Sequence, residues 1–147
     1  MNFSIQFMNK KIQGELDVLR VGKIIMNNYS ETFQSSLSYW NESDYMNQWK
    51  NGIKYIIDGH KKSCLVTSMF DPKVANYIFL WLLYLENNVV HIQNQVLFLN
   101  DLNESFNEDR IYSYISEREI IDEDGNSISE WDVKVNDFEE FLSKFYN

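Results

Sequence analysis

The stretch of residues 76–99 constrains the fold more than any other part of this sequence. Residues 76–86 are a nearly continuous run of aliphatic and aromatic side chains, which favours a strand buried on both faces, with a short helix as the alternative. The pair Asn87-Asn88 then supplies a tight turn, and residues 89–99 alternate well enough to predict a second strand. Together these features predict a β-hairpin within a sheet.

The second strand of this hairpin has two different faces. Val90 and Ile92 share one face, whereas His91, Gln93 and Gln95 share the other. We therefore expect the second group to form a polar outer face. On this interpretation His91 is a surface residue and not a general base.

Two segments have helical spacing. Residues 44–57 predict a helix that begins after Ser43 as the N-cap, ends at Gly59, and packs through its apolar side chains. A second helix is predicted at residues 137–146, with Asn136 as its cap and a stripe of aromatic and aliphatic side chains along one face.

Further strands are predicted on both sides of the first helix. They comprise residues 3–8, residues 19–26 with Gly22 as a bulge or a point of close approach, and residues 32–40, 63–70 and 128–135. We therefore predict a single α+β domain over residues 1–147. Its mostly antiparallel central sheet of about five to seven strands carries the helices, at about 44–57 and 137–146, on one side.

The acidic side chains are concentrated in the last third of the sequence. Residues 1–100 contain 8 acidic and 9 basic side chains, whereas residues 101–147 contain 14 acidic and 4 basic ones. Such a surface repels nucleic acid and anionic membranes and attracts a basic partner. We therefore expect neither nucleic acid nor membrane as a direct partner. The simpler alternative is that these charges provide solubility.

The sequence lacks the motifs that accompany common catalytic chemistry. Five scattered glycines form no phosphate-binding loop, and His60 and His91 lie in a predicted turn and strand. Cys64 is a single cysteine in an apolar strand, so we expect it to be buried and unreactive. Residues 122–125 lack the ligand spacing of a calcium loop. We predict a protein that is not an enzyme and has no catalytic residue, metal or cofactor.

The location predicted from these features is the cytoplasm. The N-terminal residues lack the apolar stretch of a signal peptide. The longest apolar run, residues 77–85, is too short to cross a bilayer as a helix. One cysteine alone cannot form an internal disulfide, which fits a reducing compartment.

An ordered set of short motifs extends through most of the chain. The set comprises residues 37–40 (LSYW), Tyr45, residues 48–49 (QW), 65–72 (LVTSMFDP), 75–76 (AN), 81–84 (WLLY), 90–98 (VHIQNQVLF), 115–118 (ISER) and 125–131 (GNSISEW). This succession resembles the CdiI immunity proteins of bacterial contact-dependent growth inhibition systems. The resemblance covers residues 17–145, and most of the shared positions are aromatic or aliphatic, so they indicate a shared core.

This resemblance implies a stoichiometric inhibitor. Such a protein binds the C-terminal toxin domain of its cognate CdiA, often a nuclease, and protects the cell that produces it. The resemblance also implies a purpose for the acidic segment, because a nuclease has a basic surface that an acidic face can cover. It leaves the toxin's activity open, and whether inhibition blocks the active site or an exosite.

Our prediction of the toxin-binding residues depends on charge and aromatic character, because toxin contacts vary within immunity families. We expect contacts from Asp101, Glu104, Glu108, Asp109, Tyr112, Tyr114, Glu117, Glu119, Asp122, Glu123 and Asp124. The alternative for the two tyrosines is that they pack under the acidic segment.

Two other classes of function remain open from the residues alone. Trp40, Trp81 and Tyr84 could line a pocket of an enzyme or a small-molecule binder, although an aromatic core explains them more simply. The chain could also be a structural subunit of a permanent assembly, which would self-associate through an apolar patch.

Overall fold

Seven strands and two α-helices confirm the α+β class within residues 1–146, which the computed structural model describes. The first antiparallel sheet contains β1 (Phe3–Gln13), β2 (Val18–Met26) and β3 (Tyr29–Ser36) in that order. The second contains β4 (Lys62–Ser68), β5 (Tyr77–Glu86), β6 (Val89–Phe98) and β7 (Trp131–Lys134), also in sequence order. The helices are α1 (Glu42–Ile57) and α2 (Val135–Phe145). The sequence did not predict the division into two sheets.

The predicted central hairpin is confirmed as β5 and β6, so residues 77–86 are a strand and not a helix. Asn87 has a φ of 57°, a left-handed conformation that asparagine tolerates better than most residues and that a two-residue hairpin turn requires. An equivalent turn joins β2 to β3, where Asn27 has a φ of 55°. The predicted strand at residues 32–40 begins too late because this second Asn-Asn signal was overlooked, and it also extends too far, since β3 ends at Ser36.

Gly22 is confirmed as a point of close approach. It pairs regularly with Phe33 of β3, and a Cβ atom at this position would lie 2.3 Å from the Phe33 ring. The irregularity lies instead in β1, whose register shifts between Phe7 and Lys11. Glycine therefore leaves room for the Phe33 ring to approach β2.

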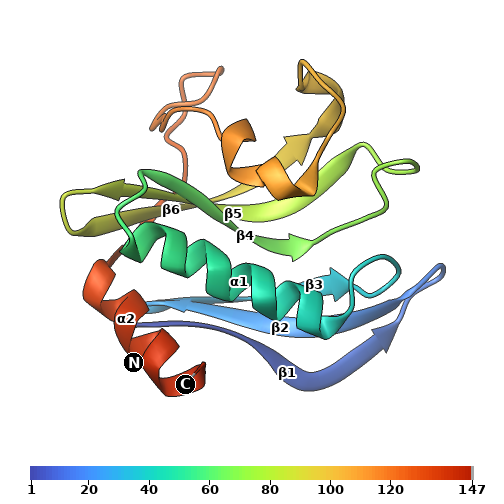
Figure 1. The fold of residues 1–147 in the computed structure, drawn as a ribbon, viewed down its shortest axis with the longest axis horizontal. Coiled ribbons are helices and arrows are strands. Elements are labelled where there is room, and N and C mark those ends of the chain that lie inside the picture. The colour runs from blue at the N-terminus through green and yellow to red at the C-terminus, as the bar shows by residue number, and fades with distance from the viewer. Residues whose placement is uncertain (147) are drawn as a thin grey trace.

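The two sheets meet along β3 and β4, and α1 packs beside this junction (Figure 1). The hydroxyl of Ser35 donates to the carbonyl of Thr67 at 2.5 Å. The Trp49 indole N–H of α1 donates to the Val66 carbonyl of β4 at 2.6 Å. Gly52 allows the close approach of the helix, since a Cβ there would lie 2.3 Å from the Cys64 carbonyl oxygen.

Both predicted helix caps were wrong by a few residues. The α1 cap is Asn41, whose side chain accepts the Asp44 N–H at 2.9 Å while its own N–H donates to the Asp44 carboxylate at 2.9 Å. This reciprocal pair satisfies two N–H groups, which Ser43 inside the first turn cannot do. The α2 helix begins directly after β7, and the Lys134 N–H donates to Asp137 at 2.9 Å. β7 is accordingly shorter than the predicted strand at residues 128–135.

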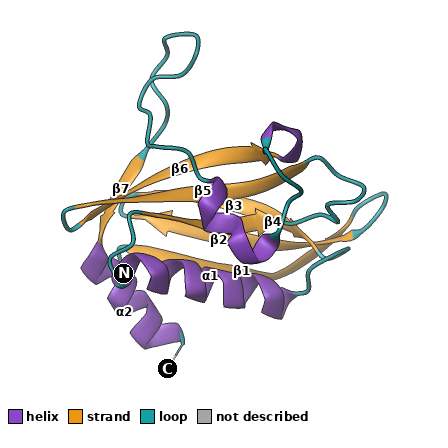
Figure 2. Cartoon of the chain, turned by 45° about the horizontal axis from the view of Figure 1, so that its top comes forward, coloured by secondary structure: helices purple, strands orange, loops and turns teal. Residues whose placement is uncertain are grey.

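The main core lies between the first sheet, the helices and one face of the second sheet. Trp49 and Trp81 are almost fully buried there, and Phe3 contacts both Phe138 and Phe141 of α2 edge to face. Cys64 is also fully buried, as predicted, and this burial raises the pKa of its thiol to about 12. Figure 2 shows α1 and α2 on one side of the sheets and long loops on the other.

Candidate protein-binding surface

Residues 99–130, which we call the covering segment, connect β6 to β7 and lie over the face of the second sheet that points away from α1 (Figures 1 and 2). The covering segment contains two short 3-10 helices, η1 (Leu99–Asp101) and η2 (Glu108–Tyr114). All eleven predicted toxin-binding residues belong to it. The structure therefore brings them to one side of the molecule, but distributes them over several surfaces.

Apolar and hydrogen-bonded contacts hold the middle of the covering segment on the sheet. Ile111 and Ile115 are 6% and 7% exposed and belong to the hydrophobic core cluster. The Tyr84 hydroxyl of β5 donates to the Ser116 carbonyl at 3.1 Å. Lys62 of β4 reaches the Ile115 carbonyl at 3.1 Å. These contacts attach η2 and the residues after it to β4 and β5.

The two predicted tyrosines are half-buried and pack within this region. The Tyr112 ring stacks on Tyr55 of α1 with 4.3 Å between centroids, and burial raises the pKa of its hydroxyl to about 12. The Tyr114 hydroxyl accepts the Asn107 N–H at 3.0 Å. The packing alternative thus describes what both rings do in the free protein.

A polar cluster attaches the second half of the covering segment, and the sequence did not predict it. Gln93 is only 2% exposed, and its amide donates to the Glu119 carbonyl at 2.9 Å and to Glu130 at 2.8 Å. The guanidinium of Arg118 donates to both oxygens of Glu130, at 2.8 and 2.5 Å. The Arg118 bonds hold the pKa of the Glu130 carboxyl below its usual range. We expected this polar face of β6 to be exposed to solvent. The covering segment instead buries it at Gln93.

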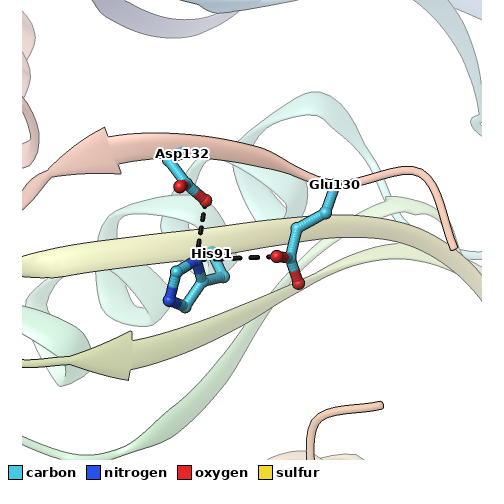
Figure 3. Close-up of side chains that lie close together, drawn as sticks. All are labelled: His91, Glu130 and Asp132. Atoms are coloured by element: carbon cyan, nitrogen blue, oxygen red, sulfur yellow. Dashed lines mark hydrogen bonds and ion pairs between the residues drawn. The ribbon is translucent and has the colours of Figure 1, made fainter. Parts of the chain in front are cut away.

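His91, Glu130 and Asp132 extend this cluster across β6 and β7 (Figure 3). Nδ1 of His91 lies 2.6 Å from Asp132 and 3.6 Å from Glu130, and all three ligand atoms lie within 4.8 Å of one another. These residue types can bind a divalent metal ion. However, Arg118 already binds both oxygens of Glu130, and the 2.6 Å separation is a hydrogen-bond distance. We interpret the group as a hydrogen-bonded polar network that joins β7 to the covering segment.

A groove of about 550 Å³, the outer groove, lies between the covering segment and strands β5 and β6. Leu80, Leu82 and Leu97 supply apolar lining from the strands, and Tyr114 lines it from η2. Its acidic lining consists of Glu117, Glu119, Asp122 and Glu123. No lysine, arginine or histidine is among the described residues that line it.

The acidic residues of the outer groove differ in their partners. Glu117 forms an ion pair with Lys62 at 3.0 Å, and its side chain is 91% exposed. Asp122 stabilises its own turn by accepting the N–H groups of Asp124 and Asn126, both at 2.9 Å. Within residues 1–146, Glu119 and Glu123 take part in no ion pair. The groove therefore keeps negative charge that the protein does not neutralise.

A second groove of about 370 Å³, the helix groove, separates η2 from α1. Glu108 and Asp109 line it beside Asp44 and Trp40. Partial burial raises the pKa of the Glu108 carboxyl, an effect that a hydrogen bond from Trp40 opposes. The remaining predicted residues, Asp101, Glu104 and Asp124, are exposed, and Glu104 pairs with Arg110 at 3.1 Å.

The three residues of the alternative aromatic pocket do not share a cavity. Trp40 lines the helix groove and Tyr84 lines the outer groove. Trp81 is 1% exposed and packs on Trp131 of β7 at 5.7 Å between centroids. These rings contribute to packing in three different places, so the structure gives this alternative no support.

Comparison with known proteins agrees with the resemblance in the sequence. The family model described as the CdiI N-terminal domain matches residues 35–141. The chain belongs to the CdiI family. The Immunity protein CdiI of Enterobacter cloacae subsp. cloacae is 32% identical over 145 residues, which cover 99% of each protein. A chain in the solved CdiA-CT/CdiI toxin and immunity complex from Enterobacter cloacae has the same fold, with a TM-score of 0.88, 32% identity and 97% of both chains covered.

The part of the chain that matches the CdiI family model includes α1, the second sheet and the covering segment. Both grooves are thus built from regions that belong to the matched CdiI domain. No helix within residues 1–146 of this CdiI protein is long and apolar enough to cross a membrane.

Proposed function

We propose that this chain is an immunity protein that binds the C-terminal toxin domain of a cognate CdiA protein and neutralises it in the cytoplasm as a stoichiometric complex. The likeness to Immunity protein CdiI over 99% of both chains is the observation that carries this proposal. The likeness to a chain of a solved toxin and immunity complex supports it. On this proposal the protein is an inhibitor and not an enzyme.

The charge of the covering segment supports a basic toxin, and a nuclease is the class that fits best. A nuclease must attract the phosphate backbone with lysine and arginine side chains. An acidic protein surface can occupy the same basic region and exclude the nucleic acid. The proposed contact residues are therefore those predicted from the sequence: Asp101, Glu104, Glu108, Asp109, Tyr112, Tyr114, Glu117, Glu119, Asp122, Glu123 and Asp124.

The test is to co-express this chain with the toxin domain encoded directly upstream of it. We expect the domain alone to stop growth, and co-expression to restore growth and to give a 1:1 complex on purification. Raising the NaCl concentration from about 0.05 to about 0.5 M should weaken the complex at least about tenfold, because salt screens exposed charges. Growth arrest that persists despite co-expression of folded protein would contradict the proposal.

A further inference from the structure

The outer groove combines two surfaces of different chemistry. Its floor contains leucine side chains of β5 and β6, and the covering segment contributes four carboxylates. All four belong to exposed residues, and the carboxylates of Glu117, Glu119 and Glu123 are not engaged in a turn as that of Asp122 is. A ligand suited to this groove has an apolar part that covers the leucines and a positive charge that reaches the carboxylates.

Lysine and arginine side chains have this combination. Their aliphatic stems cover apolar surface while their charged ends stay near water or a carboxylate. A groove of about 550 Å³ has room for several such side chains together with the backbone that carries them. We propose that the outer groove is the docking site for a segment of the CdiA toxin domain that presents two or more lysine or arginine side chains. This inference rests on the proposed function.

The way the groove is held supports its use as a binding surface. Gln93 and the Arg118–Glu130 pair attach the covering segment at both sides of Glu119. Lys62 holds the segment near Glu117. A groove whose walls are already ordered loses little conformational entropy when a partner binds. The backbone that carries the carboxylates is therefore already held against the sheet before the toxin arrives.

The helix groove is a weaker candidate for the same partner. Its volume is smaller, and partial burial of Glu108 raises the pKa of that carboxyl, which disfavours its charged form. The exposed acids of the outer groove instead keep their charge available, because Glu119 and Glu123 have no ion-pair partner among the described residues.

Two triple variants with the same change in charge test this inference. The groove variant combines Glu117→Lys, Glu119→Lys and Glu123→Lys. The control variant combines Glu15→Lys, Glu139→Lys and Glu140→Lys, at exposed acids outside the proposed contact residues. The groove triple also removes the exposed Glu117–Lys62 ion pair, so the folded state of this variant is checked first. Asp122 is left unchanged because it stabilises its own turn.

Affinity for the purified toxin domain is measured by isothermal titration calorimetry, after circular dichroism and thermal melting show that both variants are folded. We expect the groove variant to bind at least about 100-fold more weakly than the wild-type protein, and the control variant less than about tenfold more weakly. Equal weakening by both triples would overturn the inference, because long-range charge would then explain the effect. Unchanged binding by the groove variant would also overturn it.

The wild-type protein separates this inference from the proposed function. If the wild-type protein neither binds nor neutralises the toxin domain, the proposed function fails. If the wild-type protein neutralises it and the groove variant does so equally well, only the docking site is wrong. A third variant, Leu97→Gln, tests the apolar floor: we expect about tenfold weaker binding with a similar salt dependence. Full affinity in this variant would contradict a role for the floor.

Discussion

The two faces of the second sheet are covered in different ways. The face towards α1 is packed with side chains such as Trp81, Leu83 and Ile92, none more than 1% exposed. The opposite face carries Tyr84 and Gln93, which are buried under irregular backbone and hold it with hydrogen bonds. The first face has the close packing of a protein core. The second leaves a groove open between its points of attachment.

If the outer groove is the proposed docking site, this difference separates stability from recognition. Apolar packing holds the sheets and helices together, and its energy depends on the area that is removed from water. A few directional bonds fix the covering segment and still leave its carboxylates exposed. Substitutions on the face towards α1 should therefore destabilise the whole protein. Substitutions in the covering segment should loosen only that segment.

The largest expected effect belongs to the main core, which contains Trp49 of α1 together with the side chains of the second sheet that face it, such as Trp81. Trp49→Ala removes a fully buried ring that contacts Phe7 and Phe33 and donates to the Val66 carbonyl. We expect the free energy of unfolding in urea to fall by about 3–5 kcal/mol. Met46→Ala, on the exposed face of the same helix, should change it by less than about 1 kcal/mol. Similar changes in the free energy of unfolding for the two variants would contradict the division between packed and exposed positions.

A smaller effect is expected at the polar cluster. Glu130→Gln weakens the bonds to Arg118 and Gln93, and we expect a loss of about 1–3 kcal/mol in the free energy of unfolding at pH 7. Glu140→Gln, on the exposed side of α2, serves as the control.

The pH dependence of the same variant gives a second measurement. The pKa of Glu130 is lowered in the folded protein from an ordinary value of 4.5. Its contribution to stability is therefore complete above about pH 4.5 and is lost as the pH falls through the folded value. The difference between the wild-type protein and Glu130→Gln should shrink as the pH falls below about 4.5. A constant difference over this range would show that the charge of Glu130 does not carry the effect.

The smallest expected effect concerns η2. Tyr112→Leu removes the ring that stacks on Tyr55, and we expect a loss of about 0.5–1.5 kcal/mol. Hydrogen exchange should become faster at residues 108–116 and stay unchanged in β1 and β2. Tyr39→Leu is the control, since Tyr39 is 43% exposed. Faster exchange throughout the protein would indicate that η2 unfolds together with the main core and not by itself.

Local signals predicted much of the fold. The Asn-Asn turn and the run before it predicted the β5–β6 hairpin, and helical spacing predicted α1 around Trp49. The predicted N-caps of the two helices were wrong because several neighbouring residues could serve as a cap. Only the hydrogen bonds of Asn41 and Lys134 in the folded protein decide between them. The division into two sheets depends on contacts between distant segments and leaves no local pattern.

The candidate surface was predictable in charge but not in shape. The excess of acids after residue 100 is a feature of the sequence itself, and the toxin contacts stay a prediction. The packing alternative for Tyr112 and Tyr114 agrees with the contacts that their side chains make. The burial of Gln93 could not be predicted, because an alternating strand does not show what will cover its polar face. The two grooves form between the covering segment and the elements beneath it, so the sequence could not predict them either.

The close approach of α1 to β4 also restricts how related sequences can diverge. Any side chain at position 52 would collide with the Cys64 carbonyl, which belongs to the backbone and cannot move aside. Glycine at this position is therefore required for the helix to keep its place, whatever toxin a relative opposes. Glu119 and Glu123 carry no such geometric requirement. On the proposed docking site, a change of partner would therefore alter these positions and leave the scaffold around Gly52 the same.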